Sequence, residues 1–264
     1  GCGSKTLVRI GGGNLKSLVV FLVLGLTAFM TLKGLLAVPR VAVLDTVALT
    51  LPANQDLPAL LSAAPGAKPA LQVVLGGAFF LLLALFVFAS KPFRSVENVF
   101  AGVAIGGVIV AAWYVSGKIG YLAEDPNTLQ ELFVATNSGK MEALSFVAPY
   151  AYTLDLLMMW TDASKTVSFG VAAALGVVCG SFVQALAART FRWEGFGGVE
   201  DVANHLAGAA LMGFGGVTAL GCTVGQGLSG LSTLAVGSML AFLAIIAGAV
   251  AALKYQAWRM GRML

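Results

Sequence analysis

Long uninterrupted apolar runs are the dominant pattern of this chain. They predict membrane-spanning helices over six stretches and a seventh apolar segment at 141–160; the six are residues 15–36, 70–89, 98–116, 166–187, 203–220 and 231–253. Runs of this length can cross a hydrocarbon core of about 30 Å as helices. They lack the alternating polar face of a membrane barrel. The pattern therefore predicts an all-α integral membrane protein in a lipid bilayer.

Composition agrees with this class, because 58 % of the 264 residues are hydrophobic and only 11 % are charged. Between Asp201 and Lys254 there is no Asp, Glu, Lys or Arg. The formal charge of +4 does not indicate nucleic-acid binding, because the basic residues form short clusters at span ends, where they set topology.

The basic clusters predict which face of the membrane each loop occupies. All four can be cytoplasmic if 117–165 stays outside, which makes 141–160 an interfacial or re-entrant helix and puts 37–69 outside as well. The clusters are Lys5, Arg9 and Lys16; Lys91 and Arg94; Arg189 and Arg192; and Lys254, Arg259 and Arg262.

A Gly-Cys pair at the start of a glycine-rich stretch occurs twice, at Gly1-Cys2 and at Gly221-Cys222. Each copy leads into a long apolar run, and in the predicted topology the two runs enter the membrane from opposite faces. This is typical of inverted repeats with broken helices and a substrate site between them near the bilayer midplane. We expect 1–116 to hold the remainder of the first repeat with connecting spans, 117–165 an outer loop with the interfacial helix, and 166–264 the second repeat.

The glycine-rich stretches predict an anion site. Asn14 in the first half, and Ser229 or Ser232 in the second, are expected N-caps of the following helices. Such helix starts present free N–H groups and a partial positive charge. Because no Lys or Arg lies near Cys222, the anion would be held weakly, which favours passage. A polarizable thiol suits a sulfur-containing oxyanion better than phosphate.

The cysteines are expected to be free thiols. Cys2, Cys179 and Cys222 form no CxxC pair and the chain has one histidine, so we predict neither disulfide nor metal site, and no cofactor. Buried cysteine often packs as a small hydrophobe, and for Cys179, in mid-span, packing is the favoured interpretation.

Other polar and small residues of the second half have structural interpretations. His205 is expected to cap or pack at the membrane interface, and Gln226 needs either another helix or the substrate as partner. A packing face is predicted for Gly208, Gly213, Gly215 and Gly216. The chain begins inside the first motif, so we expect that an N-terminal part precedes it in the natural protein.

Several of these motifs together resemble the YeeE/YedE family of sulfur-transport proteins associated with thiosulfate uptake. The matching residues are Thr6-Leu7-Val8-Arg9, Gly11, Gly13-Asn14, Ser17, Phe191-Arg192-Trp193 and the stretch 205–230 with Leu211-Met212-Gly213 and Gly221-Cys222-Thr223. The resemblance implies a central hourglass pathway on which Cys2, Cys222 and a further N-terminal cysteine pass thiosulfate by S–H···S contacts. It also implies a TusA-like soluble sulfur carrier as partner.

The leading hypothesis is a transporter, not an enzyme, that imports thiosulfate or a related sulfur-containing anion across the cytoplasmic (inner) membrane of a bacterium. The predicted pathway comprises Gly1, Cys2, Gly221, Cys222, Thr223, Gln226, Gly227 and Ser229, and includes Thr6, Asn14 and Cys179 as further members. The alternatives are a membrane sulfurtransferase with Cys222 as a persulfide-forming nucleophile, and a structural membrane subunit.

Overall fold

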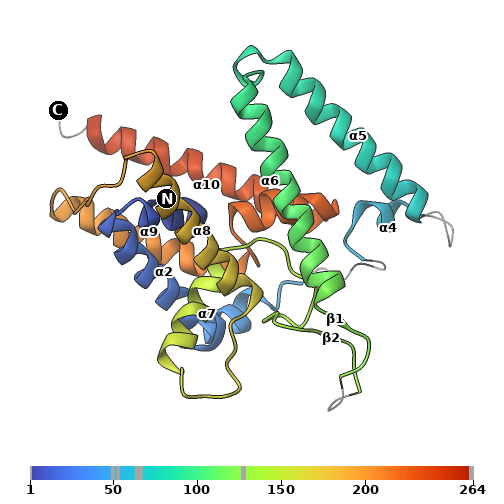
Figure 1. The fold of residues 1–264 in the computed structure, drawn as a ribbon, viewed down its shortest axis with the longest axis horizontal. Coiled ribbons are helices and arrows are strands. Elements are labelled where there is room, and N and C mark those ends of the chain that lie inside the picture. Colours follow the sequence, from blue (N-terminus) through green and yellow to red (C-terminus); the bar gives the residue numbers. More distant parts are fainter. Residues whose placement is uncertain (1, 49–50, 52–53, 63–67, 126–128, 262–264) are drawn as a thin grey trace. The chain divides into compact units, whose positions relative to one another are not determined.

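The protein is mainly helical (Figure 1). Its helices belong to two compact units. The computed structural model describes residues 2–48, 51, 54–62, 68–125 and 129–261. Unit 1 comprises residues 1–48 and 109–225, and unit 2 comprises residues 49–108 and 226–264. Each unit therefore combines an early and a later stretch of the chain.

Unit 1 is organised around α2 (Leu15–Lys33). This helix packs against α1 (Gly3–Gly11), α7 (Val147–Met158) and α9 (Val199–Thr218), while α8 (Phe169–Ala187) packs against α1 and α7. The smaller elements of unit 1 are α3 (Ala37–Pro39), the π-helical η1 (Arg40–Leu44) and η3 (Val115–Ile119), and the antiparallel strands β1 (Tyr121–Leu122) and β2 (Leu132–Phe133).

The start of α2 confirms the predicted cap. Asn14 Oδ1 accepts hydrogen bonds from the Ser17 backbone N–H and the Ser17 hydroxyl, both at 2.9 Å. Gly13, with φ +92°, precedes the cap, and a Cβ there would lie 2.6 Å from the carbonyl oxygen of Arg192. Only glycine accommodates both the backbone angle and this contact. The segment before α9 is thereby joined to the entrance of α2, where the Leu15 N–H donates to the Glu194 carbonyl at 2.9 Å.

The helix α9 runs parallel to α2 and packs closely on it. At one end Lys16 Nζ lies 2.8 Å from Asp201 Oδ2, and further along a Cβ on Gly213 would lie 2.7 Å from the Leu24 carbonyl oxygen. Gly216 is similarly close to the side chain of Val147. The predicted packing face is wrong for Gly208 and Gly215, because a Cβ at either position would meet nothing described within 4 Å.

The segment predicted as a seventh apolar stretch contains α7, a helix of 12 residues. At 1.5 Å per residue it is about 18 Å long, too short to cross the hydrocarbon core. Its buried residues, which include Val147, Tyr150 and Asp155, lie against α2, α8 and α9. The length and burial of α7 are those of a re-entrant rather than a crossing helix.

Unit 2 contains α4 (Leu57–Leu61), α5 (Lys68–Ala89), the 3-10 turn η2 (Lys91–Phe93), the first part of α6 (Val96–Tyr114), and α10 (Val236–Gly261). Before α10 lie the π-helical η4 (Gly225–Gly230), all but its first residue in unit 2, and the 3-10 turn η5 (Leu231–Thr233). The chain near Asp56 runs antiparallel to the start of α10, where Leu57 N–H donates to the Leu234 carbonyl at 3.0 Å.

The start of α10 corrects a prediction. The long helix begins at Val236, not at 231, and neither Ser229 nor Ser232 caps it. Leu234 has φ +55°, a left-handed conformation that interrupts any helix. The glycine-rich motif therefore forms its own short π and 3-10 turns before the long helix starts.

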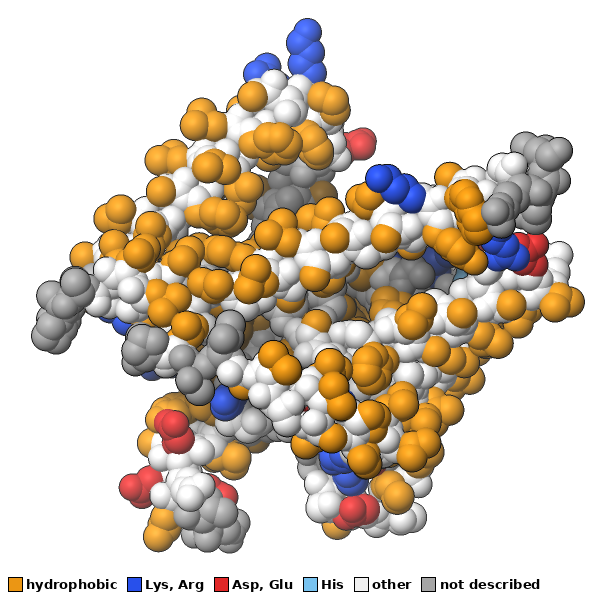
Figure 2. Space-filling view, turned by 180° about the vertical axis from the view of Figure 1, so that it is seen from behind, with side chains coloured by type: hydrophobic (Ala, Val, Ile, Leu, Met, Phe, Trp, Pro, Cys, Tyr) orange, Lys and Arg blue, Asp and Glu red, His pale blue; other side chains and the backbone are white. Residues whose placement is uncertain are grey.

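Five helices of the described chain are long and apolar enough to cross a membrane: Leu15–Lys33, Lys68–Ala89, Val96–Ile119, Phe169–Ala187 and Val236–Arg259. The predicted span 203–220 overlaps α9 (Val199–Thr218), which is not among these five helices, so this predicted span is not confirmed. Figure 2 shows hydrophobic side chains covering the helices, with charged side chains near helix ends and in loops. This distribution is that of a multi-pass membrane protein.

Candidate functional site

Both motif cysteines lie at the beginning of a short helical segment. Cys2 is the N-cap residue of α1, and Cys222 follows the turn that ends α9. After each cysteine the chain makes a short helix, breaks, and then enters a long apolar helix, α2 or α10. The predicted broken helices are therefore present in both halves.

The two motifs come together inside unit 1. The Cys2 thiol lies 3.2 Å from the Ser4 hydroxyl and also interacts with the side chain of Thr223, which directly follows Cys222. The backbone N–H groups of Ser4 and Lys5, in the first turn of α1, point toward the same thiol as hydrogen-bond donors. Residues from the two ends of the chain thus form one cluster of weak donors.

Tyr150 of α7 belongs to this cluster. Its hydroxyl donates to the Gly3 carbonyl at 2.5 Å, and its side chain belongs to the same buried cluster as Cys222. The ring is fully buried and packs on Phe21 with centroids 4.7 Å apart. The sequence interpretation placed Tyr150 only in an interfacial or re-entrant helix, because nothing local distinguishes it from the other tyrosine of that segment.

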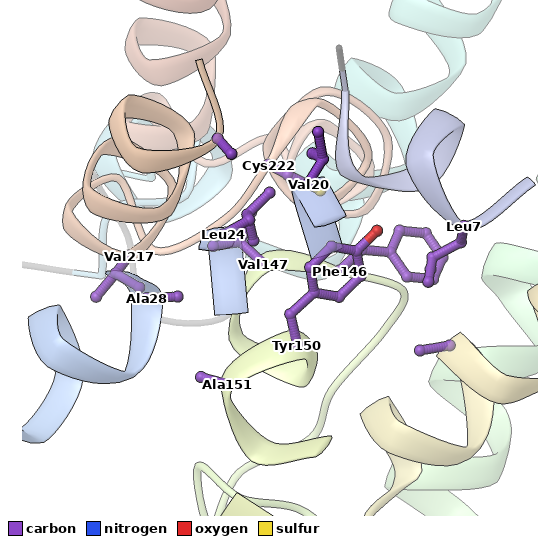
Figure 3. Close-up of a cluster of buried hydrophobic side chains, with 12 residues drawn as sticks. Leu7, Val20, Leu24, Ala28, Phe146, Val147, Tyr150, Ala151, Val217 and Cys222 are labelled. Carbon is purple, nitrogen blue, oxygen red and sulfur yellow. The ribbon is translucent and has the colours of Figure 1, made fainter. Parts of the chain in front are cut away.

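The surroundings of these groups are apolar. Cys222 is 5 % exposed and lies in a buried cluster formed by side chains of α1, α2, α7, α8 and α9. Figure 3 shows Leu7, Phe146 and Tyr150 side by side in this cluster, with Leu24 near Val147. Among the described residues no Lys or Arg is buried, and the polar groups of the cluster are the Tyr150 hydroxyl and the Cys222 thiol. Such a site can hold an anion only weakly, through dipoles and soft contacts.

Two further predicted residues form hydrogen bonds within or next to the cysteine motifs. Thr6 is buried, and both its N–H and its hydroxyl donate to the Cys2 carbonyl, at 3.0 and 3.2 Å. Gly221 is buried and its N–H donates to the Gly216 carbonyl at 2.9 Å. Gly1 lies outside the described residues.

Three predicted pathway residues fall in unit 2 instead. A Cβ on Gly227 would lie 2.7 Å from the ring of Phe242, and one on Gly230 would lie 2.9 Å from Gln226 Oε1. Ser229 is buried, and its carbonyl accepts from the Ser232 hydroxyl at 2.6 Å. In unit 2 these residues of η4 pack tightly on one another and on α10.

Cys179 does not pack as predicted. It is exposed on α8, and its neighbours Gly176 and Gly180 would meet nothing described within 4 Å if they carried a Cβ. The close contact of α8 with α1 is formed on another face, where a Cβ on Gly11 would lie 2.5 Å from the Val178 carbonyl oxygen. Cys179 therefore lies outside the packed face of α8 and is not part of the buried cluster that contains Cys222.

His205 has the predicted packing role, but it does not cap α9, whose N-cap residue Gly198 forms no side-chain cap. Its Nδ1 lies 2.7 Å from the Asp201 carbonyl oxygen and 3.0 Å from Asp201 Oδ1, and its ring packs edge-on against Phe196.

The entrance of α2 is held by two carboxylates. The hydrogen bond from Lys16 lowers the pKa of Asp201, and the hydrogen bond from Asn14 lowers the pKa of Glu194. Both carboxylates thus stay charged at neutral pH and tie α9 and its preceding segment to α2. No three His, Cys, Asp or Glu side chains of the described chain gather as metal ligands.

Comparison with known proteins places this arrangement in a family. Residues 1–251 match the family described as Sulphur transport. The chain belongs to that family. This agrees with the resemblance to YeeE/YedE proteins seen in the two cysteine motifs. Within the Sulphur transport family, 91 residues, or 34 % of this chain, are 36 % identical to the thiosulfate transporter TsuA of Escherichia coli (strain K12). The matched stretch spans 25 % of the length of that relative.

Proposed function

We propose that this protein imports thiosulfate, or a related sulfur-containing anion, along a pathway that passes Cys2 and Cys222. The observation that carries the proposal is that these two cysteine motifs, far apart in the sequence, both lie beside Tyr150. Family membership and the name of the E. coli relative support a sulfur anion as the substrate class.

The chemistry of the cluster suits passage rather than storage. The N–H groups that begin α1 and the Thr223 hydroxyl offer hydrogen bonds to anion oxygens, and the thiols offer soft contacts to a terminal sulfur. The apolar cluster around Cys222 contributes no cation that would trap the anion. Several weak contacts in sequence allow an anion to enter and leave.

The test is uptake of labelled thiosulfate by cells that lack their own importers and express the protein. Cys222→Ala and Cys2→Ala are expected to reduce uptake to the level of cells without the protein, at equal membrane abundance. Cys179→Ala is the matched control, because Cys179 is exposed and is not among the residues of the buried cluster. Full uptake by Cys222→Ala would contradict the proposal and favour a structural subunit.

The sulfurtransferase alternative makes a different prediction for the same residue. A nucleophilic Cys222 would gain one sulfur atom as a persulfide during turnover, which intact-mass analysis of the purified protein would detect. A pathway cysteine would stay a free thiol while uptake continues.

We further infer a bacterial cytoplasmic-membrane location and a TusA-like carrier that receives the sulfur inside. The support is the family resemblance and the basic clusters, including Arg9 and Arg192, on the predicted cytoplasmic side. Co-purification of a TusA-like protein from detergent-solubilised membranes, lost when Arg9 and Arg192 are both changed to Gln, is the expected result. Capture that is unaffected by these changes would contradict a basic docking face.

A further inference from the structure

Unit 1 has two polar cavities at opposite ends of α2 and α8. One, of about 370 Å³, is lined by Asn14 at the start of α2 and by Gln184 near the end of α8. The other, of about 300 Å³, is lined by Lys33 at the end of α2 and by Ser168 at the start of α8, and is named the Lys33 cavity here. In the predicted topology, the Lys33 cavity opens to the outer side.

The Lys33 cavity is rich in hydrogen-bond donors. Besides the two lysines, Lys33 and Lys165, its lining contains hydroxyl and amide side chains; these are Thr136, Asn137, Tyr152, Ser164, Thr166 and Ser168. Ammonium and hydroxyl groups are the donors that oxyanions use.

The charges in the cavity leave one lysine for a ligand. Lys165 Nζ lies 2.5 Å from Asp155 Oδ2, so this pair neutralises itself. The hydrogen bond to Asp155 raises the pKa of Lys165, so Lys165 stays charged at neutral pH. Among the described residues, no carboxylate lies within ion-pair distance of Lys33. The lining side chains therefore carry one net positive charge, while the carboxylate of Glu142, outside the lining, lies close enough to act on Tyr152.

The backbone adds to this positive potential. Ser168 is the N-cap of α8, a helix of 19 residues, and both Ser168 and Val171 of its first turn line the cavity. The N-terminal end of a helix carries a partial positive charge that favours anions. Lys33 and the N-terminal end of α8 therefore both contribute positive potential to the Lys33 cavity.

The helix α7 contributes residues both to the Lys33 cavity and to the cysteine cluster. Asp155 and Leu156 of α7 line the cavity, and Tyr150 of the same helix reaches the cluster of Cys2 and Cys222. Five residues of helix separate Asp155 from Tyr150, about 7.5 Å along the axis.

We propose that the Lys33 cavity is the entrance site of the transporter, where a small divalent oxyanion binds by charge before the thiols select for sulfur. This inference rests on the proposed function for its biological role. The occupant is thiosulfate, and sulfate, which has the same charge but no terminal sulfur, should also bind there.

The test measures binding of labelled thiosulfate and labelled sulfate to the full chain purified in detergent. Lys33→Gln should weaken the binding of both anions by about tenfold, the order expected for one charge-assisted contact. Lys33→Arg should restore most of the affinity, and Lys140→Gln, an exposed lysine of the same predicted outer segment, should change nothing. Added salt should weaken binding to the unchanged protein more than to Lys33→Gln.

The outcomes separate this inference from the proposed function. Unchanged binding in Lys33→Gln, or no binding of either anion to the unchanged protein, would overturn the entrance site. Binding that depends on Lys33 in a protein that moves no thiosulfate would support the anion site and refute the transport function. Uptake with a raised KM but unchanged maximal rate in Lys33→Gln would support both.

Discussion

At the scale of single residues, the site depends on several hydrogen bonds and thiol contacts, each of which is weak by itself. The Cys2 thiol lies beside the Ser4 hydroxyl, and Tyr150 holds the first turn of α1 through the Gly3 carbonyl. Tyr150 thereby positions Cys2, since the helix that begins beside this cysteine is fixed by a side chain from α7.

Replacing Tyr150 tests this positioning role. Tyr150→Phe keeps the ring on Phe21 but removes the hydrogen bond to Gly3, which should lower the free energy of unfolding by about 1–2 kcal/mol. Thiosulfate uptake should fall as well, because α1 is released. Tyr121→Phe is the control, since the Tyr121 hydroxyl is exposed and its contact with Glu131 is 3.3 Å long. Thermal unfolding in detergent and uptake at matched abundance measure both effects, and equal behaviour of the two variants would contradict the role of Tyr150.

At the scale of elements, close backbone approach determines how α9 sits on α2. Gly213 lies against Leu24 and Ala28 of α2, and no side chain larger than hydrogen fits there without movement. Small residues at helix interfaces have this effect in membrane proteins generally. The consequence for the site is direct, because α9 ends just before Cys222.

Two glycines of α9 make a matched pair for this packing. Gly213→Ala should lower the free energy of unfolding by about 1–3 kcal/mol, because the added methyl group overpacks the contact with Leu24. Gly208→Ala on the same helix meets nothing described within 4 Å and should be neutral or stabilising by up to about 1 kcal/mol. Melting temperatures in detergent compare the two variants, and a smaller loss for Gly213→Ala than for Gly208→Ala would contradict the packing assigned to α9.

At the scale of the whole molecule, the relative directions of helices agree with the predicted topology. In unit 1, α2 and α9 are parallel, and α8 runs the opposite way between the two polar cavities. The basic clusters predict the same alternation for the corresponding spans. Which end faces the cytoplasm stays a prediction, as does the division of the chain into two inverted repeats.

Labelling from outside tests this orientation. In intact cells, a membrane-impermeant maleimide should label Lys140→Cys, in the predicted outer segment, and should not label Thr190→Cys, in the predicted cytoplasmic loop. Both positions are exposed, so accessibility within the protein is matched. The reverse pattern would invert the topology and move the Lys33 cavity to the cytoplasmic side.

The sequence by itself determined the helical membrane class, four of the long spans to within a few residues, the cap at Asn14 and the paired cysteine motifs. These follow from local properties, namely hydropathy, the preference of Asn for N-caps and the repetition of Gly-Cys. The start of α10 was misplaced because hydropathy does not register the left-handed Leu234 or the turns of η4.

Only the tertiary structure decided which residues meet. Tyr150 and Thr223 join Cys2, Lys33 joins the start of α8, and Cys179 is left on an exposed face. Each of these outcomes depends on packing between segments far apart in the chain. The way α7 and α9 pack around α2 sets the distances between their side chains. No local pattern encodes that fit, because contacts are set by the shapes of all the packed helices together.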